Sequence, residues 1–270
     1  MTKKVSIVLI VILITFSVCF YAYYTLSYEP NDDAPESPSP NVPETPEEVD
    51  YDMLIVDNIS NWAYLDGAWF TVDTDDMENH NFAVYVDNKY MGNYRMKYGT
   101  VWNLFDNNDS YVEYTGDLFA YSNNFNVNVA NYTINGVGPN EITEITNILN
   151  HEINQNSLSI NEVVQMDLDA NGIMDKIVNI SNLDSVEEEQ YYFNLCYVVL
   201  NNQIKVLIND SVESRELLLY PVYKLRYIFK YADNNSYSFI LQEGYFSNAG
   251  KTQNNLYDIV NGEYIKSFSD

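Results

Sequence analysis

The nine residues from Asp167 to Asp175 restrict the fold of this chain more than any other segment. Side chains that carry oxygen occupy its first, third, fifth and ninth positions: Asp167, Asp169, Asn171 and Asp175. Gly172 at the sixth position allows a sharp reversal, because a residue without Cβ adopts a left-handed conformation at little cost. With the backbone carbonyl of Ile173 at the seventh position, the spacing predicts five oxygen ligands, a set that suits Ca²⁺ and not a soft metal.

The residues on either side of this segment predict strands. Residues 161–166 and 176–180 are rich in β-branched side chains, and Val178 occupies the twelfth position, where an EF-hand needs a bidentate Glu. We therefore expect a calcium loop within a β-hairpin, with the ion as a structural clip. The alternative is a solvated acidic turn, since Asn and Asp are common throughout the chain.

The segment resembles the FG-GAP or VCBS-type repeat, whose signature is Asp-x-Asp-x-Asn/Asp-Gly-x-x-Asp between two strands. Here the match is followed by the apolar pair Ile177-Val178. The resemblance implies that the acids, Asn171 and the Ile173 carbonyl are the ligands. It also implies blade-like β units over 158–270, in an exported protein that serves adhesion, ligand binding or scaffolding. More broadly, the chain resembles small anchored surface proteins of bacteria.

A faint internal echo accompanies the motif. Residues 194–205 align with residues 255–266, and the later copy has the segment 231–236 in place of the liganded loop. That segment lacks the ligand spacing, which predicts one liganded unit and one degenerate unit.

The part before the motif predicts a mainly β (α+β) fold. Alternating polar and apolar residues with frequent turn signals indicate an antiparallel β meander of about six to eight strands over 51–136. Within a connection at 137–157, an apolar face preceded by Pro139 predicts one helix over 141–153.

The N-terminus predicts export. Lys3 and Lys4 precede an apolar run from Val5 to Leu26, which as a helix would extend about 33 Å, enough to cross a bilayer. Residues 29–50 hold most of the prolines, eight acids and no Lys or Arg, which predicts a solvated linker. The positive-inside rule puts the N-terminus in the cytoplasm and the rest outside. Residues 1–28 are then a single-pass transmembrane anchor in the cell membrane, or alternatively a cleaved signal peptide.

The charge of the chain restricts its partners. The net charge of −26 argues against nucleic acid, which requires clustered Lys and Arg. The two cysteines, Cys19 and Cys196, are not expected to meet, so a bound ion is a natural substitute for a disulfide.

These features predict a cell-surface protein that binds or adheres to a protein or glycan of the envelope or its extracellular surroundings. The alternative is an exported enzyme, or enzyme accessory, that acts on cell-wall or external polysaccharide, although no nucleophile or zinc motif is present and no catalytic residue is predicted. Trp62, Trp69 and Trp102 could stack on sugars, but such residues more often fill a β core. An acidic cluster predicts a solvated loop: Asp73, Asp75, Asp76 and Glu78.

Overall fold

The fold comes from a computed structural model, in which the described residues belong to one compact unit, Asp50–Asp270. The structure describes residues 51–57, 60–98, 102–106, 116–183, 191–212, 221–245 and 252–269. The predicted anchor (1–28) and linker (29–50) lie outside these residues. Within the described ranges, no helix has both the length and the apolarity needed to cross a membrane.

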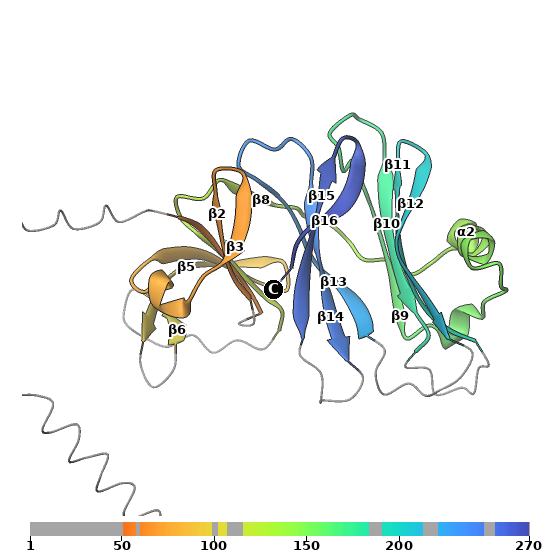
Figure 1. The fold of residues 1–270 in the computed structure, drawn as a ribbon, viewed down its shortest axis with the longest axis horizontal. Coiled ribbons are helices and arrows are strands. Elements are labelled where there is room, and N and C mark those ends of the chain that lie inside the picture. Colours follow the sequence, from red (N-terminus) through yellow and green to blue (C-terminus); the bar gives the residue numbers. More distant parts are fainter. Residues whose placement is uncertain are drawn as a thin grey trace, which may run out of the picture. The chain divides into compact units, whose positions relative to one another are not determined.

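The described chain is mainly β and contains three antiparallel sheets and one α-helix (Figure 1). The N-terminal sheet has the strand order β3-β2-β1-β7-β4-β5-β6. Its strands are β1 (Asp52–Val56), β2 (Ser60–Leu65), β3 (Ala68–Thr71), β4 (Asn81–Val86), β5 (Lys89–Tyr98), β6 (Trp102–Phe105) and β7 (Leu118–Ser122). A short 3₁₀ helix, η1 (Thr74–Met77), joins β3 to β4.

The N-terminal sheet is not the simple meander that the turn signals predict. β7 inserts between β1 and β4, with Val56 opposite Phe119 on one side and Val84 opposite Ala120 on the other. The physical reason is burial: four of the five residues of β7 are buried, which fits a central strand.

The middle sheet has the order β12-β11-β10-β9. Its strands are β9 (Ile160–Met166), β10 (Asp175–Ser181), β11 (Tyr192–Leu200) and β12 (Gln203–Val212). The C-terminal sheet has the order β16-β15-β14-β13-β8. Its strands are β8 (Val127–Val129), β13 (Pro221–Tyr231), β14 (Ser238–Tyr245), β15 (Gln253–Val260) and β16 (Glu263–Ser269). β8 therefore belongs to a sheet formed mainly by the C-terminal residues, although it lies within the predicted region 51–136.

The α-helix of the described residues, α2 (Pro139–Leu149), packs on one face of the middle sheet through Ile145, which is buried with Val163 and Val178. The helix ends at residue 149 and not at 153, because Asn150 adopts a left-handed conformation with φ of 52°. A 3₁₀ turn, η2 (Gln155–Ser157), follows it.

The C-terminal sheet lies between the other two sheets (Figure 1). On one face, Phe239 and Leu241 pack in the core that contains Val164 of the middle sheet. On the other face, Ile240 packs in the core that contains Phe119 of the N-terminal sheet. Burial on both faces explains the short apolar runs of 227–229 in β13 and 239–241 in β14.

The middle and C-terminal sheets each contain a meander of four strands in the same order, β9–β12 and β13–β16. The turn after Leu200 in the first meander corresponds to the turn after Val260 in the second, a separation of 60 residues. The sequence echo at 61 residues is therefore displaced by one. Side chains alternate between the two faces of a sheet, so an alignment displaced by one residue would pair side chains that lie on opposite faces. The two meanders therefore correspond at a separation of 60 residues.

Candidate metal centre

The metal loop, residues 167–174, joins β9 to β10 beyond the cross-strand pair of Met166 and Asp175. Both flanking elements are strands, which agrees with a hairpin loop and not with an EF-hand. Two loop residues have positive φ, Ala170 at 61° and Gly172 at 85°. A Cβ added to Gly172 would meet no atom within 4 Å, so glycine is needed there for its backbone conformation and not for space.

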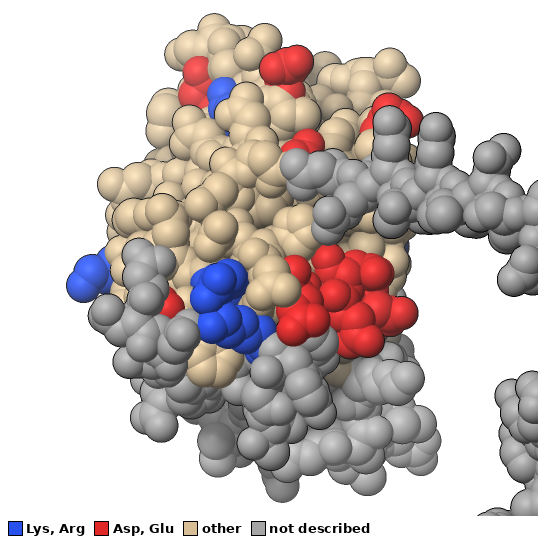
Figure 2. Space-filling model, turned by 90° about the vertical axis from the view of Figure 1, so that its left-hand side faces the viewer, with Lys and Arg blue, Asp and Glu red and all other residues tan. Residues whose placement is uncertain are grey.

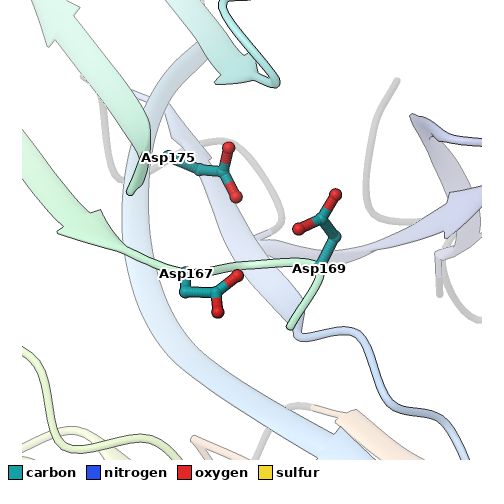
Figure 3. A group of neighbouring side chains, drawn as sticks. All are labelled: Asp167, Asp169 and Asp175. Carbon is teal, nitrogen blue, oxygen red and sulfur yellow. The ribbon is translucent and has the colours of Figure 1, made fainter. Parts of the chain in front are cut away.

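Three carboxylates converge at this loop. One oxygen from each of Asp167, Asp169 and Asp175 lies within 4.8 Å of the other two, and the three side chains point toward a common space (Figure 3). At such a separation two unit charges repel by about 3 kcal/mol at an effective dielectric constant of about 20. Burial raises the pKa of Asp175, and the charges of Asp169 and Asp167 raise it further, against hydrogen bonds from the N–H groups of Asn201 and Leu168. Positive charge placed between the carboxylates would therefore stabilise the loop.

Backbone N–H groups hold the carboxylates in place. The Asn171 N–H donates to Oδ1 of Asp167 at 3.0 Å, and the Gly172 N–H donates to its Oδ2 at 2.8 Å. The Leu168 N–H donates to Oδ2 of Asp175 at 3.0 Å. The ion pairs of the described residues join Lys and Arg to other acids, and none includes Asp167, Asp169 or Asp175.

The two remaining predicted ligands are less clearly placed for a metal ion. The amide nitrogen of Asn171 donates to Oδ2 of Asp169 at 2.9 Å, while its amide oxygen accepts from the Ile173 N–H at 2.7 Å. The amide group would have to turn over before its oxygen could face a cation. Ile173 lies in the loop and is 47% exposed, and its apolar side chain offers no ligand, so its contribution would come from the backbone carbonyl.

Asn201, which the sequence reasoning does not identify, also contacts the loop. It lies in the turn between β11 and β12, where its amide nitrogen donates to Oδ2 of Asp169 at 2.9 Å. Its amide oxygen accepts from the Asn171 amide at 2.5 Å, and its backbone N–H donates to Oδ1 of Asp175 at 3.1 Å. The signal that could have found it is the strand order. In an antiparallel meander, alternate connections lie at the same end of the sheet, so the β11–β12 turn neighbours the β9–β10 loop.

Chemically, the loop offers hard oxygen donors on a fixed backbone. Carboxylate and carbonyl oxygens are the ligands that Ca²⁺ prefers, whereas soft metals prefer thiolate or thioether groups. The geometry of the three aspartates thus fits a bound Ca²⁺, and Asn171 fits it after a turn of its amide.

No known family, curated protein or solved structure matches the chain.

A second acidic group surrounds η1. Asp73, Asp75, Asp76 and Glu78 are exposed, and the view of this side in Figure 2 shows acidic side chains gathered in one patch beside a small basic group. The segment forms a 3₁₀ helix and not the loop that the sequence predicts. Exposed acidic groups are common without an ion, and we assign no site to this patch.

The tryptophans of the described side chains fill a core. Trp62 is fully buried, and its ring lies edge-on to Phe268 with centroids 5.4 Å apart. Trp69 lies edge-on to Tyr231 at 5.0 Å. These two rings pack between the N-terminal and C-terminal sheets, which is the core role that the sequence favours over a sugar platform. The side chain of Trp102 lies outside the described part.

A group of half-buried and buried polar side chains surrounds Arg226 of β13. Its guanidinium lies 3.5 Å from Asp57 at the end of β1 and also pairs with Asp117. Gln242 of β14 donates to Asp57 at 2.7 Å. Burial raises the pKa of Asp57, and Arg226 opposes that rise. This network ties the N-terminal sheet to the C-terminal sheet, and a structural role accounts for its charges.

Proposed function

We propose that this chain is a single-pass cell-surface protein whose β ectodomain is stabilised by one Ca²⁺ and works by binding or adhesion to an envelope or extracellular partner. The observation that carries the proposal is the convergence of Asp167, Asp169 and Asp175 within 4.8 Å, held by backbone N–H groups. The ion would join the end of β9, the start of β10 and the loop between them.

The proposed site has five ligands, of which three are the converging aspartates. The three aspartates would supply carboxylate oxygens, while Asn171 and the backbone carbonyl of Ile173 would complete the coordination. Asn201 would support the site from the neighbouring turn by orienting Asp169. The role of the ion is structural, because it would neutralise carboxylates that otherwise repel one another.

Two features support an assignment to FG-GAP or VCBS-type repeats. The middle and C-terminal sheets contain meanders of four strands in one order, and the metal loop joins the first two strands of the first meander. We propose that these meanders are blade-like units, one with a calcium loop and one without. Two units are too few to close a propeller by themselves.

The proposed location agrees with the proposed ion. Residues 1–28 would anchor the chain in the cell membrane with the N-terminus cytoplasmic, and the linker 29–50 would hold the β ectodomain away from the bilayer. Extracellular calcium modules bind Ca²⁺ with dissociation constants of about 10⁻⁴ to 10⁻³ M, which suits the calcium levels outside cells. The partner would be a protein or glycan and not nucleic acid, given the net charge of −26.

A retention experiment tests the proposed function. The purified full-length chain is immobilised and exposed to isolated envelope proteins and envelope polysaccharides, in calcium and in EDTA. We expect one of the two fractions to be retained, and to be retained better in calcium. Release of soluble fragments from the polysaccharide, without retention, would instead support the exported enzyme or enzyme accessory as the function.

A further inference from the structure

A polar pocket lies at the connection between β13 and β14. We define the second loop as residues 230–237, which lie beyond the β13–β14 pair of Phe229 and Ser238 and include the last two residues of β13. It has the same length as the metal loop. The pocket has a volume of about 310 Å³ and opens to solvent. Its lining comes from the second loop, from β8 and from the residue before β8: Asn126, Asn128, Lys230, Ala232, Asp233, Asn234 and Asn235.

The second loop occupies the place in its meander that the metal loop occupies in the first, but its chemistry differs. Counted from the paired strand ends, Lys230 replaces Asp167, Ala232 replaces Asp169 and Ser238 replaces Asp175. All three converging carboxylates are therefore lost, and an ammonium group stands at the first position. This loop offers no cage for a cation.

The loop is nevertheless held in a defined shape around the pocket. The Asn126 amide donates to the Ala232 carbonyl at 3.1 Å, and the Ser236 N–H donates to the Asn234 side chain at 3.0 Å. The Lys230 ammonium lies 4.4 Å from the centre of the Tyr237 ring, which restrains the side chain. Asn128 is the cross-strand partner of Lys230. A polar cavity built from restrained side chains is suited to a ligand.

The lining indicates the kind of ligand. Four amide side chains both donate and accept hydrogen bonds, which matches the dual character of hydroxyl groups. One Lys and one Asp leave the lining without net charge, and the chain as a whole is acidic, which disfavours an anionic polymer. The pocket volume lies at the low end of the range for small-molecule sites, and it suits the terminal unit of a polymeric ligand better than a large ligand.

From these properties we infer that the pocket binds the end of a neutral glycan, through hydrogen bonds from the Asn side chains and Lys230. The inference rests on the proposed binding function and names the class of partner. The metal loop contacts the second loop directly, because the Tyr237 N–H donates to the Leu168 carbonyl at 2.7 Å. The Tyr264 hydroxyl donates to the Tyr237 carbonyl at 2.5 Å and fixes the same residue.

Calorimetric titration of the full-length chain tests the inference. The probes are neutral trisaccharides of hexoses, pentoses and N-acetylhexosamines, with trigalacturonate as the anionic counterpart, all in excess calcium. We expect at least one neutral probe to bind and trigalacturonate not to bind. Asn128→Ala and Lys230→Met should each weaken binding about five-fold, the loss that one removed hydrogen bond produces.

The matched control is Asn261→Gly, which changes an Asn in the β15–β16 turn and keeps the left-handed conformation found there, with φ of 55°. It should leave affinity unchanged, and melting curves of all variants check that they fold. Neutral binding that survives both pocket substitutions would overturn the inference. The inference would also be overturned if no neutral probe binds while the chain still retains an envelope fraction in the retention experiment. If no probe binds and no envelope fraction is retained, the proposed function would be overturned as well.

Discussion

At the scale of single residues, the carboxylates that are withdrawn from solvent have two kinds of surroundings. Glu162 of β9 accepts hydrogen bonds from the Asn179 amide at 2.6 Å and from the Leu225 N–H at 2.9 Å, so its charge has internal partners. Asp175 instead lies beside two further carboxylates, Asp167 and Asp169. The first arrangement has its hydrogen-bond partners within the protein, while the second would gain from the cation that we propose.

Glu162 gives a prediction about pH. Burial raises its pKa above the ordinary value of 4.5, although hydrogen bonds from Leu225 and Asn179 and the charges of Lys224 and Arg226 oppose the rise. The folded state therefore keeps the proton to a higher pH than the unfolded chain does. The contribution of Glu162 to the free energy of unfolding is thus full below about pH 4.5 and falls as pH rises through the folded pKa.

Urea unfolding of the wild type and Glu162→Gln across this range measures that contribution. The wild type should lose stability relative to the variant as pH increases, and the difference should become constant above the folded pKa. A difference that grows in favour of the wild type with increasing pH would mean that the pKa is lowered.

Gly172 gives a second prediction. Its φ of 85° strains any residue with a Cβ, and the space around it is open, so Gly172→Ala isolates the backbone cost. We expect a loss of about 1–2 kcal/mol in the free energy of unfolding, measured in EDTA. The matched control is Gly244→Ala in β14, where the nearest atom to an added Cβ is at 4.0 Å and φ is not in the left-handed region. Equal effects of the two substitutions would refute the backbone explanation.

At the scale of elements, hairpins bring the site together. Much of this could be predicted from sequence, because alternation identifies β9 and β10 and the Asp spacing identifies three residues that converge. The role of Asn201 could not be predicted without the strand order, since the contact joins two separate hairpins. The insertion of β7 between β1 and β4 also escapes sequence reasoning, because strand pairing over such distances depends on which faces are buried together.

The two equivalent turns provide a third prediction. Asn201→Gly keeps the left-handed turn but removes the amide that orients Asp169, whereas Asn261→Gly makes the same change in the β15–β16 turn. Loss of one net hydrogen bond, about 1 kcal/mol, should weaken calcium affinity several-fold for Asn201→Gly. Calorimetric calcium titrations should find Asn261→Gly unchanged. Identical affinity for both variants and the wild type would remove Asn201 from the site.

At the scale of the whole β unit, the C-terminal sheet connects the other two sheets through a core on each face. The Phe119 ring of β7 stacks on Tyr227 with centroids 4.6 Å apart and lies 5.0 Å from Phe229. Arg226 and Gln242 add polar contacts to Asp57 across the same boundary. We therefore expect a substitution at this boundary to destabilise the sheets on both sides of it.

Phe119→Ala tests this expectation. The substitution leaves a cavity in a fully buried position, and we expect a loss of about 3–5 kcal/mol in the free energy of unfolding. Amide hydrogen exchange should become faster in β13 and β14 as well as in the N-terminal sheet. Faster exchange confined to the N-terminal sheet would show that the sheets unfold independently.

Thermal unfolding of the full-length chain in about 10 mM calcium and in EDTA tests the proposed structural ion most directly. The calcium concentration is about 10 to 100 times the expected dissociation constant. Binding to the folded state alone should add about 1–3 kcal/mol, or about 3–10 °C in the melting temperature, and Asp167→Asn should abolish the difference. A wild-type melting temperature that is the same in calcium and in EDTA, or a calcium effect that Asp167→Asn leaves intact, would contradict a structural ion at the metal loop.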